Sequence, residues 1–172
     1  FKGDPSFVFH PMNAHTDNNI VTCDVCEFEQ APLFPWADGT PGDPAKAVPR
    51  LTRWRFDLAA NSDEFKSERL DDLACEFPRL DERFTATNYR YGFFAADNNP
   101  KFKVGGFNGI GRVDHESGNT EIHDVGEACA TNEPIFVPKS VDSPEGEGFV
   151  LANVYDANRR ASHLLILDAQ NV

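Results

Sequence analysis

Two cysteines, Cys23 and Cys26, have the spacing found in zinc knuckles and in redox dithiols. The surrounding residues 19–28 have the pattern of a β-strand, in which side chains three positions apart point to opposite faces. One metal ion could not bind both thiolates unless the strand bulged, and the chain holds no second CxxC motif to complete a zinc site. We therefore interpret both residues as core or surface cysteines.

Residues 104–114 read VGGFNGIGRVD and are rich in glycine, as are loops that bind phosphate groups. The run lacks the Gly-Lys-Ser/Thr ending of a phosphate-binding loop, and it leads into a predicted strand where such a loop leads into a helix. We expect its glycines to serve hairpins or bulges. Acyl transfer is not indicated either, because the chain contains no Gly-x-Ser-x-Gly nucleophile elbow.

The histidines differ in their surroundings. His115, His123 and His163 lie in polar turns or at strand edges, where solvated or hydrogen-bonded imidazoles are expected. His10 follows the apolar residues FVF, so we expect its imidazole at the inner mouth of a β-structure, among aromatic side chains. A buried structural histidine and a metal ligand both remain open on this evidence, because a metal site needs at least two further ligands.

The elements that must position these residues are predicted to be strands. Trp54, Phe56 and Leu58 fall on one face of a period-two pattern and charged residues fall on the other, although residues 50–77 are the longest stretch without glycine or proline. The sequence therefore predicts an all-β fold. Further strands are predicted at residues 6–10, 19–28, 65–70, 89–95, 107–113, 120–124, 148–156 and 162–168.

One short pattern, a strand that ends in aspartate and leads into a polar turn, occurs three times. Its aspartates are Asp57, Asp114 and Asp168, in RLTRWRFDLAAN, FNGIGRVDHESGN and HLLILDAQN. A period near 55 residues, with about four strands in each unit, is typical of β-propeller blades with long loops. Residues 1–172 are thus predicted to form one partial β-propeller domain of about three blades, in an incomplete ring. The alternative is that the motif is a common hairpin start that recurs by chance.

Charge and composition exclude several classes of function. The formal net charge of −12 would repel nucleic acid and anionic membranes. No apolar stretch approaches the length of a transmembrane helix, and no secretory signal pattern is present. Four cysteines without an N-glycosylation motif favour a reducing, cytoplasmic location. Because the chain starts at Phe1 and its single methionine is internal, we do not expect a complete reading frame.

Three separated motifs resemble the carotenoid cleavage oxygenase family. The run FVFHPMNAH is similar to the third iron-ligand segment, Phe-His-x-x-Asn-Ala, with the match on Phe9, His10, Asn13 and Ala14. ACEFPRLDER is similar to the segment that carries an iron-orienting glutamate, here Glu76. NEPIFVPKSVDSPEGEGFV and the hairpin after it are similar to the segment that carries another such glutamate, here Glu133.

The resemblance extends over essentially all 172 residues but over only about a third of a family member. CEFEQAPLFPWADG, PRLTRWRFDL and the Arg-Tyr-Gly at residues 90–92 resemble the lignostilbene dioxygenase branch in particular. The family fold is a seven-bladed β-propeller, which agrees with the independent repeat count.

The family resemblance implies a site and a reaction. Family members hold Fe(II) with four histidines that are oriented by three glutamates, and they use O2 to split an alkene into two carbonyl fragments. It implies that His10 is an iron ligand, that Glu76 orients it, and that Glu133 supports a ligand outside this chain. The remaining three histidines, the third glutamate, and the tyrosine and lysine that recognise a substrate phenol are expected outside residues 1–172. We therefore expect the isolated chain to be inactive.

The implied parent enzyme is an iron(II)-dependent dioxygenase that cleaves the C=C bond of a stilbene-type phenylpropanoid into two aldehydes. Its partners are O2 and a hydrophobic conjugated small molecule; the oligomeric state is not predicted. Alternatives are a carotenoid or apocarotenoid cleavage oxygenase and a non-catalytic β-propeller scaffold. A carbohydrate-active propeller would need paired carboxylates, for which Asp24, Asp57, Asp114 and Asp168 are candidates, although solvated aspartates in turns explain them more simply.

Overall fold

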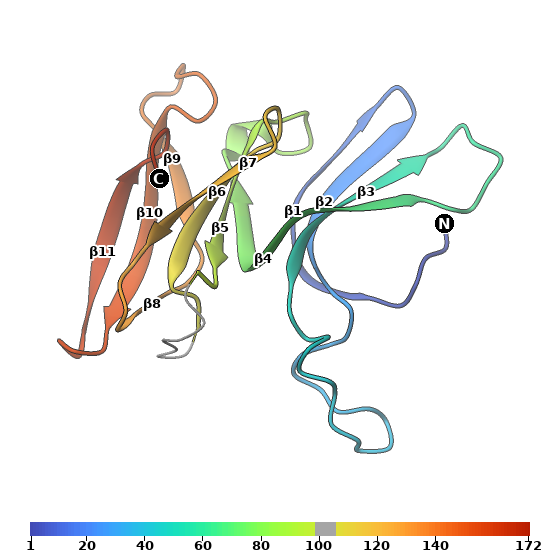
Figure 1. Ribbon diagram of the computed structural model, residues 1–172. Helices are drawn as coiled ribbons and strands as arrows, with labels where there is room; N and C mark the ends of the chain where they lie inside the picture. Colours follow the sequence, from blue (N-terminus) through green and yellow to red (C-terminus); the bar gives the residue numbers. More distant parts are fainter. Residues whose placement is uncertain (99–105) are drawn as a thin grey trace.

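The computed structural model describes residues 1–98 and 106–172, and within these ranges the chain forms eleven β-strands and one 3-10 turn, η1 (Glu82–Phe84) (Figure 1). The all-β prediction is confirmed. No helix in the described part of the chain is long and apolar enough to cross a membrane. The strands are β1 (Phe7–Asp17), β2 (Ile20–Phe28), β3 (Arg50–Asp57), β4 (Lys66–Leu80), β5 (Tyr91–Ala96), β6 (Gly109–Asp114), β7 (Asn119–Asp124), β8 (Cys129–Thr131), β9 (Ile135–Pro138), β10 (Gly148–Asp156) and β11 (Ala161–Asp168).

The strands form three groups that follow one another in chain order (Figure 1). Strands β1 to β7 pair antiparallel in sequence, and the long strand β4 belongs to two groups. Its first part pairs with β3, from Lys66 to Ala74, and its second part pairs with β5, from Cys75 to Leu80. The third group contains β10 with β11 on one side and β8 and β9 on the other. The number of blades in a complete ring stays a prediction.

Asp57 and Asp114 end β3 and β6, which are each paired on both sides in the first and second groups, and Asp168 ends β11, at the edge of the third group. Each carboxylate accepts a hydrogen bond from the backbone N–H two residues later, at 2.9, 3.0 and 2.9 Å. Asp124 and Asp156 make the same bond at the ends of β7 and β10. The repeated motif is therefore an aspartate turn at the end of a strand. These carboxylates hold turns and do not form an acid/base pair.

Several predicted strand boundaries were wrong. The strand predicted at residues 6–10 continues to Asp17, and the one predicted at 65–70 continues to Leu80. Both extensions pass through β-bulges, which accommodate the prolines Pro11 and Pro78 because bulged residues need not donate to the ladder. The short strands β8 and β9 were not predicted.

The core fills the two spaces between neighbouring groups. Phe93 and Phe94 are consecutive on β5 and point to opposite faces, so each belongs to a different core cluster. Phe94 packs with residues of the first two groups, and Phe93 stacks on Phe136 of β9 with ring centroids 5.3 Å apart. Each group is thus held to its neighbour mainly by burial of apolar side chains.

Of the described glycines in the 104–114 run, Gly106, with a φ of 102° in the connection before β6, agrees with the hairpin-or-bulge expectation, whereas Gly109 and Gly111 correct it. Gly109 and Gly111 lie in β6, which pairs with both neighbours without a register shift. A Cβ atom at Gly111 would lie 2.1 Å from the ring of Phe94, so the missing side chain makes room for that ring. Val104 and Gly105 lie outside the described residues.

A buried polar cluster joins the first two groups. Asp24 of β2 accepts two 2.7 Å hydrogen bonds from the Arg53 guanidinium and one of 2.5 Å from the hydroxyl of Tyr89. Nε2 of His115 lies 2.9 Å from the same hydroxyl. The expectation that Asp24 is solvated was wrong: its side chain is 1% exposed, because Tyr89 and His115 of the second group cover it. Charge-assisted bonds offset the cost of burying these groups.

The stability of the fold is predicted to rise between about pH 4 and pH 6.5 because of His115. Burial lowers the pKa of His115 to about 4, although Asp24 opposes the shift. The unfolded chain therefore binds a proton in this range that the folded chain excludes, and the stabilisation, up to about 3 kcal/mol, is lost as the pH falls. Denaturant unfolding at several pH values measures the slope, and His115→Gln should reduce it. An equal slope in that variant would contradict the assignment.

Candidate functional site

His10 lies in a bulged stretch of β1. Val8 pairs with Glu27 and Pro11 pairs with Val25, so β1 spans this interval with one residue more than β2. A bulge rotates the side chains next to it out of the regular alternation. The sequence predicted that His10 ends its strand. The strand instead continues to Asp17, and the bulge within it turns the His10 side chain. Its ring lies beside those of Phe9 and Phe77, which agrees with the expected aromatic surroundings.

Glu76 lies at a second bulge, in the part of β4 that pairs with β5. Glu76 pairs with Ala95 and Arg79 pairs with Phe93, so Phe77 and Pro78 together face a single residue of β5. Phe77 has a φ of 54°, in the left-handed region that large side chains rarely adopt. Both candidate residues are thus presented by irregular backbone at points where β1 and β4 come together.

The structure brings His10 and Glu76 into direct contact. Nδ1 of His10 lies 2.6 Å from Oε2 of Glu76, and the backbone N–H of Phe77 donates to the same oxygen at 2.5 Å. The Glu76 side chain is 6% exposed and that of His10 is 47% exposed. Because a carboxylate only accepts, Nδ1 carries the imidazole proton. The lone pair then lies on Nε2, for which no hydrogen-bond partner exists among the described residues.

A histidine in this arrangement suits two kinds of chemistry. A neutral imidazole whose N–H is held by a carboxylate is a good metal ligand, because the carboxylate fixes the tautomer and raises the basicity of the other nitrogen. The same pair could serve as a general base. Oε1 of Glu76 is buried without a partner in the described part of the chain, so no contact to that oxygen draws the carboxylate away from His10.

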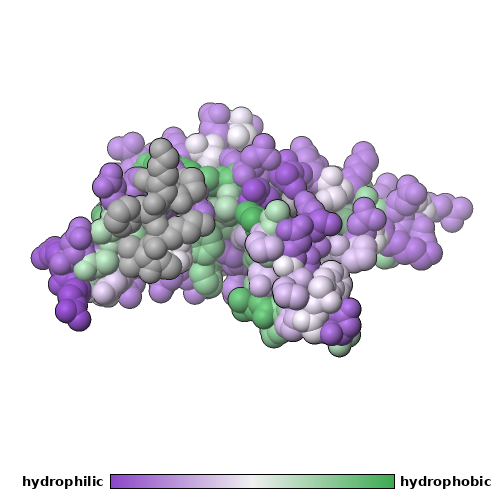
Figure 2. All heavy atoms as spheres, turned by 60° about the horizontal axis from the view of Figure 1, so that its bottom comes forward, coloured by the Kyte–Doolittle hydropathy of each residue, from purple (hydrophilic) through white to green (hydrophobic). Residues whose placement is uncertain are grey.

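An apolar cavity of about 410 Å³ opens at the His10–Glu76 pair. Among the described residues that line it, His10 and Glu76 alone carry ionisable side chains. The space-filling view from below shows hydrophobic side chains gathered near the middle of a mostly hydrophilic face (Figure 2). The volume falls within the roughly 300–1,000 Å³ typical of small-molecule sites. The remaining walls are formed by Phe9, Phe28, Phe77 and Phe107, with Pro32, Leu33, Ala47 and Pro49.

Asn13 fastens β1 to the segment that follows β4. Its Nδ2 donates to the backbone oxygens of Phe84 and Thr87 at 3.3 and 3.1 Å, and its Oδ1 accepts from the N–H of Ala86 at 3.0 Å. The side chain is buried, three residues beyond His10. Asn13 therefore helps to hold the strands of His10 and Glu76 together, a role that the sequence pattern alone did not reveal.

Glu133 lies apart from this pair. It precedes β9, its side chain is 48% exposed, and its Oε1 accepts a 3.1 Å hydrogen bond from Arg79. No contact between Glu133 and His10 or Glu76 exists within the described residues. The expectation that Glu133 orients a ligand outside this chain stays a prediction.

The cysteines do not form a metal site in the described part of the chain. Cys26 is buried in the first core cluster, whereas Cys23 is half-buried and outside it, as the opposite-face argument predicted. A hydrogen bond with Cys75 and burial raise the pKa of Cys26, so its thiol is not the anion that binds metals. No cluster of three or more potential metal ligands occurs among the described residues. A metal at His10 would thus need ligands from outside the described residues.

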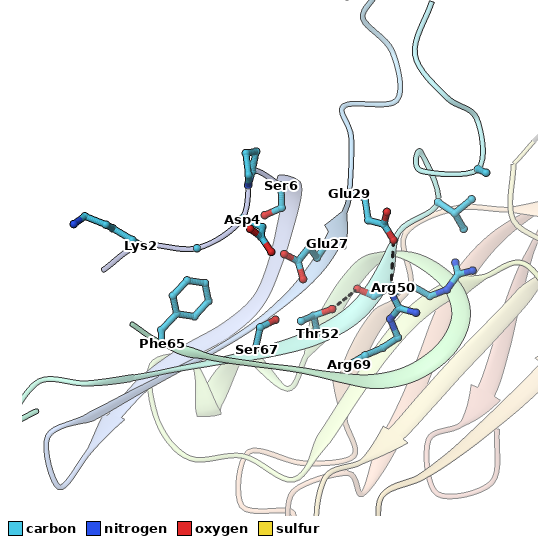
Figure 3. Close-up of a pocket in the computed structure, with 14 residues that line it drawn as sticks. Lys2, Asp4, Ser6, Glu27, Glu29, Arg50, Thr52, Phe65, Ser67 and Arg69 are labelled. Atoms are coloured by element: carbon cyan, nitrogen blue, oxygen red, sulfur yellow. Dashed lines mark hydrogen bonds and ion pairs between the residues drawn. The ribbon is translucent and has the colours of Figure 1, made fainter. Parts of the chain in front are cut away.

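A second cavity, of about 620 Å³, lies between the N-terminal segment and one face of the first strand group (Figure 3). Its lining is polar and of mixed charge, with Asp4 and Glu27 across from Arg50 and Arg69. It contains no histidine or cysteine among the described residues. The side chains that line this cavity therefore give no reason to place a metal site or a catalytic base there.

All 172 residues match the family model described as retinal pigment epithelial membrane protein. The chain is 36% identical to the isoeugenol monooxygenase of Pseudomonas putida over 178 residues, which cover 99% of this chain and 37% of that protein. It is also 36% identical to lignostilbene-alpha,beta-dioxygenase isozyme III of Sphingomonas paucimobilis over 180 residues, covering 96% of this chain and 36% of that protein.

The fold is similar to the crystal structure of Pseudomonas brassicacearum lignostilbene dioxygenase, with a TM-score of 0.89 at 30% sequence identity. That match covers 97% of this chain and 37% of the other chain. The chain therefore spans little more than a third of the length of the relatives that it matches.

Proposed function

This chain belongs to the retinal pigment epithelial membrane protein family, as the resemblance to carotenoid cleavage oxygenases predicted, and we propose that it forms part of a non-haem Fe(II) dioxygenase that cleaves a C=C bond with O2. The observation that carries the proposal is the contact of His10 with Glu76 at the wall of an apolar cavity. A scaffold protein has no need for a carboxylate-held imidazole in such a place.

The His10 imidazole, held by Glu76, fits one ligand position of an iron site. Glu76 holds the proton of His10 on Nδ1 and leaves Nε2 as the only donor atom of the ring. Bound iron would supply the activation of O2 that side chains cannot provide. Because one imidazole cannot hold Fe(II) against water, the other three histidines are proposed to come from parts of the full-length protein outside these residues. Glu133 is proposed to orient one of them.

The cavity favours a hydrophobic, flat substrate. Four phenylalanines line it, and aromatic rings pack well against a conjugated molecule. The relatives at 36% identity are named for isoeugenol and lignostilbene, which are phenolic compounds with an alkene side chain. We therefore propose that the substrate is an alkenyl phenol of the phenylpropanoid type, such as a stilbene, and that cleavage gives two carbonyl products. A carotenoid or apocarotenoid is the second candidate.

The full-length protein that carries this chain provides the test. Purified without oxygen and loaded with Fe(II), it is expected to bind one iron per chain and to convert a hydroxystilbene or isoeugenol to aldehydes only when O2 is added. An apocarotenoid tested in parallel decides between the two substrate classes. Protein that binds no iron and cleaves none of the three compounds would contradict the proposal and favour the scaffold alternative.

We also propose that the protein acts in the cytoplasm. All four cysteines are free, which suits a reducing compartment. Fractionation of cells that express the tagged full-length protein tests this, and recovery in the periplasmic or extracellular fraction would contradict it.

A further inference from the structure

Phe77 combines three features at the wall of the candidate site. Its backbone is in the left-handed region, with a φ of 54°. Its N–H donates to Oε2 of Glu76 at 2.5 Å, and its ring lies 5.2 Å from the ring of His10. A large side chain in this backbone region is strained, and such strain persists only where the surrounding structure imposes it.

The strain has a local cause. Phe77 and Pro78 are the two bulged residues that face one residue of β5. Proline after Phe77 disfavours the right-handed helical conformation, which leaves extended or left-handed backbone. Proline itself has no N–H to donate, so the bulge leaves no donor unpaired at that position. The sequence Glu-Phe-Pro therefore supports a bulge at which the Phe77 N–H is free to turn away from the strand ladder.

The Glu76–Phe77 peptide is turned so that its N–H meets the Glu76 carboxylate, and the left-handed φ at Phe77 lets the strand rejoin its ladder after that turn. In a regular strand, the N–H of residue 77 would point into the plane of the sheet, and the Glu76 side chain would stand roughly perpendicular to it. Glu76 would then lack its backbone donor, and Oε2 would be held by His10 alone. With the N–H in place, one oxygen accepts from both Phe77 and His10, which fixes the direction of the carboxylate.

We propose that Phe77 is a positioning residue whose left-handed backbone keeps the Glu76–Phe77 peptide turned toward the Glu76 carboxylate, and so holds Oε2 at Nδ1 of His10. The role of that pair in metal binding rests on the proposed function, but the aiming of the carboxylate does not. The backbone conformation carries the effect, and the aromatic ring contributes only to the wall of the cavity.

Substitutions at residue 77 distinguish the effect of its backbone conformation from the effect of its aromatic ring. Phe77→Gly removes the ring but adopts positive φ without strain, whereas Phe77→Ile keeps an apolar side chain and strongly disfavours positive φ. Phe107→Ile is the matched control, because Phe107 lines the same cavity and contacts the Phe77 ring without a left-handed backbone. If Phe77→Ile does not fold, Phe77→Ala replaces it, since alanine at positive φ is also strained.

The first measurement uses the metal-free, full-length protein with ¹⁵N-labelled histidine. The proton on Nδ1 of His10, assigned by its absence in His10→Gln, should give a hydrogen-bonded signal in the wild type, Phe77→Gly and Phe107→Ile. It should be lost or strongly shifted in Phe77→Ile. An unchanged signal in Phe77→Ile, or a loss in Phe77→Gly equal to that in Phe77→Ile, would overturn the proposal.

The second measurement is the affinity for Co²⁺ and the visible spectrum of the bound ion. Phe77→Ile should lose about tenfold or more in affinity, the scale found for residues that orient metal ligands, while the other two variants stay within about threefold. Equal losses in all three variants would count against the backbone role. If the wild type binds no metal, the proposed function fails, and the histidine signal still decides the role of Phe77.

Discussion

His10→Ala in the full-length protein is expected to lower both iron affinity and alkene cleavage by more than about 100-fold. Loss of residues that merely orient metal ligands already costs about 10- to 100-fold, and His10 is proposed to be a ligand itself. The variant should fold, because the His10 side chain is 47% exposed and only its bond to Glu76 is lost. Iron content after dialysis and the turnover of a hydroxystilbene measure the effect.

Two further variants make this result specific. His163→Ala removes an exposed histidine on β11 and should leave iron content unchanged. Glu76→Gln keeps an acceptor for Nδ1 but removes the charge, so an intermediate loss of about 10- to 100-fold is expected. Full iron content in His10→Ala, with the fold intact, would contradict the assignment of His10 as a ligand.

Asp24→Ala is expected to destabilise the protein by about 3–5 kcal/mol. The substitution leaves the Arg53 guanidinium, whose side chain is 14% exposed, without its carboxylate. It also removes the carboxylate acceptor of the Tyr89 hydroxyl, which is left with only its 2.9 Å contact to Nε2 of His115. Urea unfolding of the variant and the wild type measures the difference.

A surface ion pair that involves β3, the strand of Arg53, is the control for Asp24→Ala. Arg55 and Glu68 pair between β3 and β4 with side chains 39% and 56% exposed, and exposed pairs contribute little. Glu68→Ala should therefore cost less than about 1 kcal/mol. The double variant Asp24→Leu/Arg53→Met, which removes both charges, should recover part of the loss. A loss for Asp24→Ala no greater than for Glu68→Ala would show that the buried cluster is not a stabilising contact.

The sequence predicted the fold class and much of the pair at the site. Period-two patterns such as that around Trp54 depend only on which face is buried, so they identified most strands. The repeated aspartates marked strand ends because each starts the same kind of turn. The motif resemblance singled out His10 and Glu76, which the structure places 2.6 Å apart although 66 residues separate them.

The features that the sequence did not predict depend on irregular backbone and on contacts between groups. Register irregularities carried β1 past Pro11 and β4 past Asp71 and Asp72, where proline and polar residues suggested strand ends. Asp24 was predicted to be a solvated residue of a polar strand face, because its neighbours in sequence do not indicate that Tyr89 and His115 cover it in the fold. The left-handed backbone of Phe77 likewise follows from register, for which Glu-Phe-Pro was the only local sign.

Anomalous diffraction at the iron edge, from crystals of the full-length protein, would show directly whether His10 binds iron through Nε2. We expect a single iron peak at bonding distance from Nε2 of His10, with Nδ1 still hydrogen-bonded to Glu76 and the metal facing the apolar cavity. Iron bound through Nδ1, iron bound directly by the Glu76 carboxylate, or an iron site away from His10 would contradict this expectation.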